Sequence, residues 1–248
     1  MKEVMNSLTN YQVRTRDVGA VIFALTLPSL VTLVYFVWAE RFPAGVQQAI
    51  YAVAKVVQFV FPIAWVLGAQ RRRPRASRPV TRGVGWGLVF GLAAAAAMLA
   101  VYHNWLKSTD FFAAAEGQMR EKIAGFQLGE PWKFVALGVF YSLFHSLLEE
   151  YYWRWFVFGQ LRMMTPVWVA VAVSSLGFMA HHVIVLAKYF GLASPVTWVL
   201  SLGIAMGGAF WAWLYHRSGS LLGPWLGHLL VDAAIFAAGY EIVQTMIG

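Results

Sequence analysis

Seven long apolar stretches constrain this chain more than any other feature of its sequence. Each has the roughly 20 mostly apolar residues that a helix needs to cross about 30 Å of hydrocarbon. Only 12% of the residues are charged, about half the share found in soluble domains. We therefore expect an all-α, polytopic transmembrane helix bundle of about seven spans, within a range of about six to eight. The expected spans are residues 18–39, 46–69, 83–106, 133–161, 166–188, 195–215 and 221–247.

One integral membrane domain is expected over residues 1–248, because the sequence has no internal repeat and no separate soluble region. Residues 107–132 interrupt the apolar pattern, since charged residues are interspersed there with aromatic and aliphatic ones. This segment fits an amphipathic helix at the membrane surface and, nearly as well, a solvated loop. A run of alanines at 93–97 indicates close helix packing in the third span. The lack of cysteine excludes disulfides, thiolate metal sites and a thiol nucleophile.

Basic residues gather in the short loop between the second and third spans. With seven spans, this loop lies on the same side as the amino terminus and the turns that hold Arg162 and Arg217. Short basic loops mark the cytoplasmic side, so we expect the amino terminus and the 71–82 loop to be cytoplasmic. The net charge of +8 does not indicate nucleic acid, because no aromatic-interleaved basic surface accompanies it. The loop arginines are Arg71, Arg72, Arg73, Arg75, Arg78 and Arg82.

Several ionisable residues fall inside the expected spans rather than in the loops. A charge at the centre of a membrane helix costs about 2.5–3.5 kcal/mol, so such residues need partners, a water-filled cavity or both. They are functional-site candidates for the same reason. At a rise of about 1.5 Å per residue they fall in one band near mid-membrane, although they come from three helices. These residues are His145, Glu149, Glu150, Arg154, His181, His182, His228 and Asp232.

The spacing of these residues indicates different roles for the two adjacent glutamates. Glu150 and Arg154 are four residues apart, so they can form an ion pair on one helix face. Glu149 points about 100° away from that face and stays free to accept a proton. His228 and Asp232 are also four apart, so both can face the same site.

Each motif has a structural interpretation beside the functional one. The carboxylates and Arg154 could form an ion-pair network that fixes helix packing, and a buried histidine could bond a neighbouring carbonyl. His181 and His182 are adjacent, so at most one of them points straight at a shared site. His181 fits a supporting or a purely structural role equally well. His145 lies on the Glu149 side of its helix, but nearer its end, and fits a structural or substrate-lining role.

Three short motifs resemble those of a known family. Residues Glu149–Arg154, EEYYWR, fit EExxxR, the first motif of the CAAX protease and bacteriocin-processing (CPBP) family of intramembrane proteases. Phe178–His182 fits the second motif, FxxxH, and His228–Asp232 fits the third, HxxxN or HxxxD. The motifs occur in the family's order on successive helices. From about residue 133 to 248, the chain therefore resembles a CPBP endopeptidase of the CAAX prenyl protease 2 type.

This resemblance implies a helix bundle around a polar intramembrane cavity that opens to the cytosol. It also implies peptide-bond hydrolysis by a water that Glu149 activates, with His182 as its partner. His228 and Asp232 would stabilise the oxyanion, while Glu150 and Arg154 would hold the helix geometry. The implied partners are a peptide or protein substrate, which reaches the site through the membrane or from the cytosol, and the lipid bilayer.

Asp232 departs from the family pattern, in which asparagine is commoner. An amide donates a hydrogen bond to an oxyanion, whereas an ionised carboxylate repels it. Asp232 must then be protonated, orient His228 by accepting its N–H, or help to bind a metal. We expect no cofactor. The alternative is zinc, for which Glu149, His182, His228 and Asp232 are suitable ligands.

The leading hypothesis is therefore a glutamate-dependent intramembrane endopeptidase. A non-catalytic membrane scaffold of the same fold is the second hypothesis, although a scaffold does not need the complete set of motifs. A proton-coupled transporter is the third, because buried Glu and His also form proton relays. The sequence shows no paired broken helices or inverted repeat of the kind that transporters often have.

Overall fold

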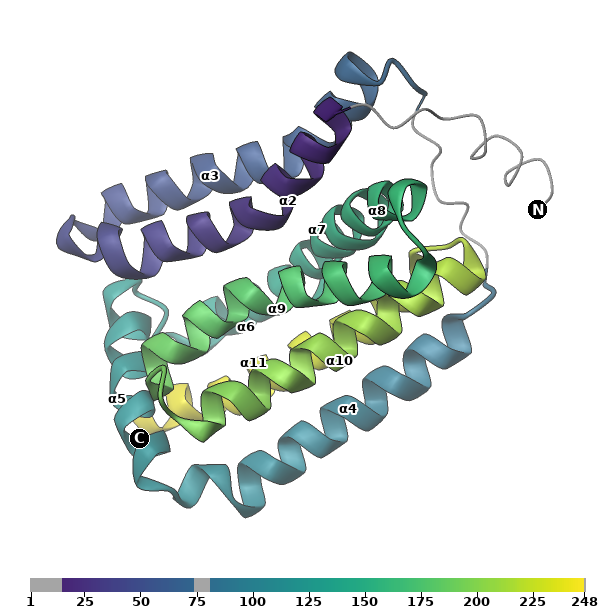
Figure 1. Ribbon diagram of the computed structural model, residues 1–248. Helices are drawn as coiled ribbons and strands as arrows, with labels where there is room; N and C mark the ends of the chain where they lie inside the picture. The colour runs from purple at the N-terminus through teal and green to yellow at the C-terminus, as the bar shows by residue number, and fades with distance from the viewer. Residues whose placement is uncertain (1–14, 74–80, 248) are drawn as a thin grey trace.

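The computed structural model describes residues 15–73 and 81–247, and all the regular structure in these ranges is helical. Six helices or helical runs are long and apolar enough to cross a membrane. They run side by side along one direction in Figure 1, which agrees with the expected multi-pass bundle. They comprise α2 (Thr15–Leu33) with η1 (Val34–Trp38) and η2 (Ala39–Arg41), α3 (Ala44–Ala64) with η3 (Trp65–Ala69), α4 (Val84–Asn104) with η4 (Leu106–Ser108), α9 (Val167–Phe190), α10 (Pro195–Ser218) and α11 (Leu222–Ile247).

The expected span at 133–161 is also helical, but it is less apolar than the other six. Its polar residues, among them Glu149, Glu150 and Arg154, lower its hydropathy, and it lies at the centre of the main apolar core. Tyr152 and Trp153 are almost completely buried there. The run consists of α6 (Pro131–Phe140), η5 (Tyr141–His145), α7 (Ser146–Glu150), η6 (Tyr151–Phe158) and α8 (Gly159–Met164), of which η5 and η6 are π-helical. π-Helical turns are rare and occur frequently at functional sites.

The surface of the bundle agrees with a lipid environment. Large apolar side chains of the outer helices are exposed, for example Ile22 on α2, Val53 on α3 and Val89 on α4. Soluble monomers rarely expose such extended apolar faces. Together with the six apolar helices, this surface identifies an integral, multi-pass membrane protein.

Residues 107–132, for which helix and loop both remained open, form helix α5 (Asp110–Gly125) in their middle part. Figure 1 shows α5 lying across one end of the bundle rather than parallel to the spans. Its buried Phe112, Ala115 and Ile123 face the bundle. The segment is therefore placed as an amphipathic helix at the membrane surface would be.

The opposite end of the bundle carries Arg16, Arg72, Arg162 and Arg217. Arg16 donates to the carbonyl oxygen of Ala69 at 2.7 Å, and Arg72 contacts the sulfur of Met163 at 3.5 Å. The start of α2, the end of η3 and the end of α8 are thus neighbours. Arg162 and Arg217 lie in the last turns of α8 and α10 at this end. The loop arginines Arg75 and Arg78 lie outside the described residues.

Helices α4 and α11 approach each other at glycines. A Cβ added to Gly87 would lie 2.0 Å from the carbonyl oxygen of Gly223, and one added to Gly91 would lie 2.7 Å from that of Gly227. The close packing expected of the third span is thus made by glycines, before the run of alanines at 93–97 begins. The contact matters for the site because Gly227 immediately precedes His228.

Replacing Gly87 with alanine should destabilise the protein, because its Cβ would meet backbone atoms that cannot rotate away. We expect a loss of about 1–3 kcal/mol in the free energy of unfolding, typical of overpacking. Denaturation in detergent measures it. Gly85→Ala on the same helix is the matched control, since its Cβ would meet nothing within 4 Å. Equal stability of the two variants would contradict the close approach.

Candidate active site

The Glu150 carboxylate joins two helices in the interior of the bundle. Glu150 is fully buried, and its Oε2 lies 3.1 Å from Nε of Arg154, as the four-residue spacing predicts. Its other oxygen, Oε1, lies 2.8 Å from Nδ1 of His228 on α11, within hydrogen-bond distance. One carboxylate therefore fixes both an arginine of η6 and a histidine of α11.

Aromatic rings enclose the charged groups of this pair. The Arg154 guanidinium lies 4.7 Å from the centre of the Phe178 ring and 5.2 Å from that of Trp211, both within cation–π range. Trp211 in turn stacks on the imidazole of His228, with ring centres 4.5 Å apart and planes 16° apart. These rings exclude water and leave each charged group little freedom to turn.

Glu149 lies beside this network. Its side chain is nearly buried, at 5% exposure, and three histidine Nε2 atoms surround its carboxylate: His181 at 3.7 Å, His228 at 3.7 Å and His145 at 4.0 Å. These separations exceed a direct hydrogen bond. The two adjacent glutamates thus differ as the sequence predicts, one firmly bound and the other surrounded by loosely placed histidines.

The adjacent histidines of α9 lie differently around Glu149. His181 is the one of the two whose Nε2 lies within 4 Å of the Glu149 carboxylate, and its ring stacks on Trp153 at 5.7 Å with planes 4° apart. His182 bonds through Nδ1 to the carbonyl oxygen of Phe178 at 2.9 Å. Because Nδ1 then donates, the Nε2 atom of His182 is left to accept or exchange a proton. The two rings touch, with centres 4.1 Å apart.

Asp232 lies at the more open side of the cluster. Its Oδ1 is 3.6 Å from Nε2 of His228, and its side chain is 17% exposed, against 5% for that of His228. Nε2 of His228 therefore lies between the carboxylates of Asp232 and Glu149. Among the described residues, no group of three or more His, Asp and Glu is spaced as a metal site requires.

Sequence reasoning missed a charged residue near Glu149. Lys55 lies in the second expected span, and its ammonium group sits 5.5 Å from the Tyr51 ring centre and 5.4 Å from that of Phe59. Phe59 contacts the ring of His145, and Lys55 is within electrostatic range of Glu149. The sequence alone could have identified Lys55, because placing a lysine in a membrane span costs about as much free energy as placing a glutamate there.

Comparison with known proteins gives a family match. Residues 131–234 match a family described as Type II CAAX prenyl endopeptidase Rce1-like. The matched segment contains all three motifs, from Glu149 to Asp232, and confirms the predicted resemblance to the CPBP family. It indicates a protease, and therefore a hydrolase, of the CAAX endopeptidase type. No curated protein and no solved structure matches the chain.

The ion pair of Glu150 and Arg154 generates a stability prediction. Glu150→Gln and Arg154→Met should each lower the free energy of unfolding by about 3–5 kcal/mol, because each leaves an uncompensated buried charge. The double variant should lose less stability than the sum of the two single losses. The difference, the coupling free energy, should be about 0.5–3 kcal/mol.

The matched control is the pair Glu116 and Arg120 on α5, which has the same spacing and a distance of 2.6 Å but is partly exposed. Its coupling should be below about 1 kcal/mol. Denaturant titration in mixed micelles measures both cycles. If the coupling free energy of the buried pair were no larger than that of the control pair, the assignment of Glu150 and Arg154 as a buried ion pair would be contradicted.

Proposed function

We propose, from the CAAX endopeptidase match over residues 131–234, that this protein is an intramembrane endopeptidase in which Glu149 activates a water molecule. The observation that carries the proposal is the difference between the two glutamates. Glu150 is held by Arg154 and His228, whereas Glu149 is surrounded by histidine nitrogens at 3.7–4.0 Å. A scaffold would not need a loosely held carboxylate beside a firmly held one.

The proposed reaction begins when Glu149 accepts a proton from water while the oxygen attacks the carbonyl carbon of the substrate peptide. The carbonyl oxygen becomes an oxyanion, which His228 stabilises by donating a hydrogen bond. The carbon–nitrogen bond then breaks, and the proton passes to the leaving amine. His182 supports this transfer, because Phe178 binds its Nδ1 and leaves Nε2 for proton exchange. Nothing is oxidised or reduced.

Asp232 is proposed to orient His228 rather than to bind the oxyanion. Its Oδ1 is 3.6 Å from Nε2 of His228, while Glu150 holds the opposite nitrogen at 2.8 Å. Carboxylates on both sides of the ring favour the form in which both nitrogens carry protons. Such a ring is a suitable donor to a developing negative charge, which explains how an aspartate is tolerated at this position.

The orientation and the access route are further parts of the proposal. The end of the bundle with Arg16, Arg72, Arg162 and Arg217 is proposed to face the cytoplasm, with the amino terminus and the 71–82 loop on that side. Around Glu149, Asp232 and His145 are partly exposed, at 17% and 16%, whereas His181 and His228 are buried. A peptide is proposed to approach Glu149 between α11 and η5, from the membrane or from the cytosolic side.

Replacing Glu149 with glutamine should abolish cleavage, because an amide cannot accept the proton of the water. We expect kcat to fall by at least about 10²–10⁴-fold, the usual contribution of a general base. The assay uses purified protein and a fluorogenic peptide library that includes prenylated peptides. Glu130→Gln is the control, since that carboxylate is exposed and pairs with Lys133 outside the Glu149 cluster.

The same assay with a chelator tests the zinc alternative. Activity that survives chelation supports the metal-free mechanism, whereas loss that zinc restores would assign Glu149, His182, His228 and Asp232 to a metal site. A folded wild-type protein that cleaves no peptide would contradict the proposal and favour the scaffold. Proton-coupled solute uptake by proteoliposomes without cleavage would favour the transporter.

The two adjacent histidines should differ in their effect on kcat. We expect His182→Ala to lower kcat by about 10²–10⁴-fold, as loss of a proton-transfer group does. His181→Ala should lower it by less, because His181 positions Glu149 through a 3.7 Å contact and stacks on Trp153. Steady-state kinetics measures both variants, with His103→Ala as the control near the end of α4. A larger loss of kcat in His181→Ala than in His182→Ala would assign proton transfer to His181 and a positioning role to His182.

A further inference from the structure

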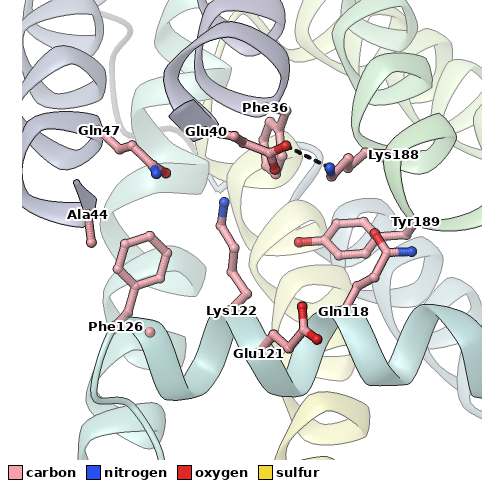
Figure 2. Close-up of a pocket in the computed structure, with 11 residues that line it drawn as sticks. Phe36, Glu40, Ala44, Gln47, Gln118, Glu121, Lys122, Phe126, Lys188 and Tyr189 are labelled. Atoms are coloured by element: carbon pink, nitrogen blue, oxygen red, sulfur yellow. Dashed lines mark hydrogen bonds and ion pairs between the residues drawn. The ribbon is translucent and has the colours of Figure 1, made fainter. Parts of the chain in front are cut away.

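A second site lies at the end of the bundle opposite Arg162 and Arg217. A cavity of about 420 Å³ opens where α5 meets the ends of the spans, and α5, η1, η2, α3 and α9 contribute to its wall. Figure 2 shows Lys122 reaching from α5 toward Glu40, with Glu121 beside its base. The proposed peptidase does not use any of the residues that line this cavity.

The charges in the cavity are not all paired with each other. Glu40 and Lys188 form an ion pair at 2.8 Å. Lys122, in contrast, has no carboxylate within 4 Å among the described residues. Its ammonium group instead lies 4.6 Å from the centre of the Tyr35 ring and 5.0 Å from that of Phe36. Glu121, the neighbouring carboxylate, likewise has no ion pair within the described ranges.

Two uncommitted charges of opposite sign therefore face one cavity. Burial lowers the pKa of the Lys122 ammonium and Lys188 lowers it further, while Glu40 opposes both effects. An anionic group placed beside Lys122 would stabilise its charged form. A cationic group beside Glu121 would complete the pairing, so the charges of the cavity match a zwitterion.

The surroundings of the cavity are those of the membrane surface. Helix α5 lies across the span ends (Figure 1), and Trp38 and Phe42 beside the cavity are 55% and 47% exposed, as residues of an interfacial belt are. A ligand with its head in the cavity can therefore place apolar chains against Trp38 and Phe42.

We propose that this cavity binds the headgroup of a zwitterionic, amine-bearing phospholipid, with its phosphate on Lys122 and its ammonium on Glu121. A lipid fits better than a soluble zwitterion because the cavity lies at the span ends beside the exposed apolar side chains of Trp38 and Phe42. The proposal is independent of the peptidase activity, because the cavity and the Glu149 cluster share no residue.

The test measures binding of three lipids to the full-length protein by native mass spectrometry after delipidation in detergent. The probes are phosphatidylethanolamine, phosphatidylglycerol, which has a phosphate but no amine, and diacylglycerol, which has neither. The wild type should bind them with decreasing affinity in that order. Glycerophosphoethanolamine, the headgroup without chains, should bind more weakly than the intact lipid, whereas equal binding would overturn the lipid assignment.

The variants separate the contributions of the two charges. Lys122→Gln should weaken binding of both phospholipids by about 10–100-fold, as loss of a charge-assisted bond does, and Lys122→Arg should retain it. Glu121→Gln should abolish the preference for phosphatidylethanolamine over phosphatidylglycerol, leaving phosphatidylglycerol binding within about threefold of the wild type.

Arg120→Gln is the matched control, because it removes a charge from the same helix outside the cavity. Its lipid binding should equal that of the wild type. The proposal is overturned if Lys122→Gln binds phospholipid as the wild type does, or if diacylglycerol binds as well as phosphatidylethanolamine. It is also overturned if an acidic peptide occupies the cavity and phosphatidylethanolamine does not compete with it.

Discussion

Glu150 lies fully buried between a guanidinium on its own helical run and an imidazole on α11, 78 residues further along the chain. A carboxylate in this position is costly to bury, and it is stable only because Arg154 and His228 both compensate it. The separation of roles in the site depends on this compensation. With Glu150 engaged on both oxygens, Glu149 is the carboxylate that remains to exchange protons.

The position of His228 depends in turn on packing elsewhere. Its helix, α11, lies against α4 through glycines whose backbones touch, and Gly227 is one of them. This contact sets how close α11 comes to the rest of the bundle and which way its side chains face. Helix α4, which contributes no chemical group to the site, therefore helps to determine where the imidazole of α11 meets Glu150. The aromatic rings of Trp211 and Phe178 complete the enclosure.

Much of this arrangement follows from the sequence because a membrane restricts what charged residues can do. The spacing of Glu150 and Arg154 predicted their ion pair, and the density of ionisable residues in late spans predicted one cluster. The contact of His228 with Glu150 was not predictable, since it depends on the rotation of α11 against α4. Nor could spacing decide which of His181 and His182 would face Glu149, because adjacent residues differ by only about 100°. Lys55 was missed, although placing a lysine in a membrane span costs about as much free energy as placing a glutamate there.

The most direct test of this account is the ¹⁵N NMR spectrum of histidine-labelled protein in detergent. We expect a protonated, hydrogen-bonded Nδ1 on His228, whose signal shifts much more in Glu150→Gln than in Glu149→Gln. Loss of the His228 signal in His228→Gln assigns it. A His228 Nδ1 signal that responds to Glu149→Gln and not to Glu150→Gln would contradict the account, because Glu149 would then be the bound carboxylate.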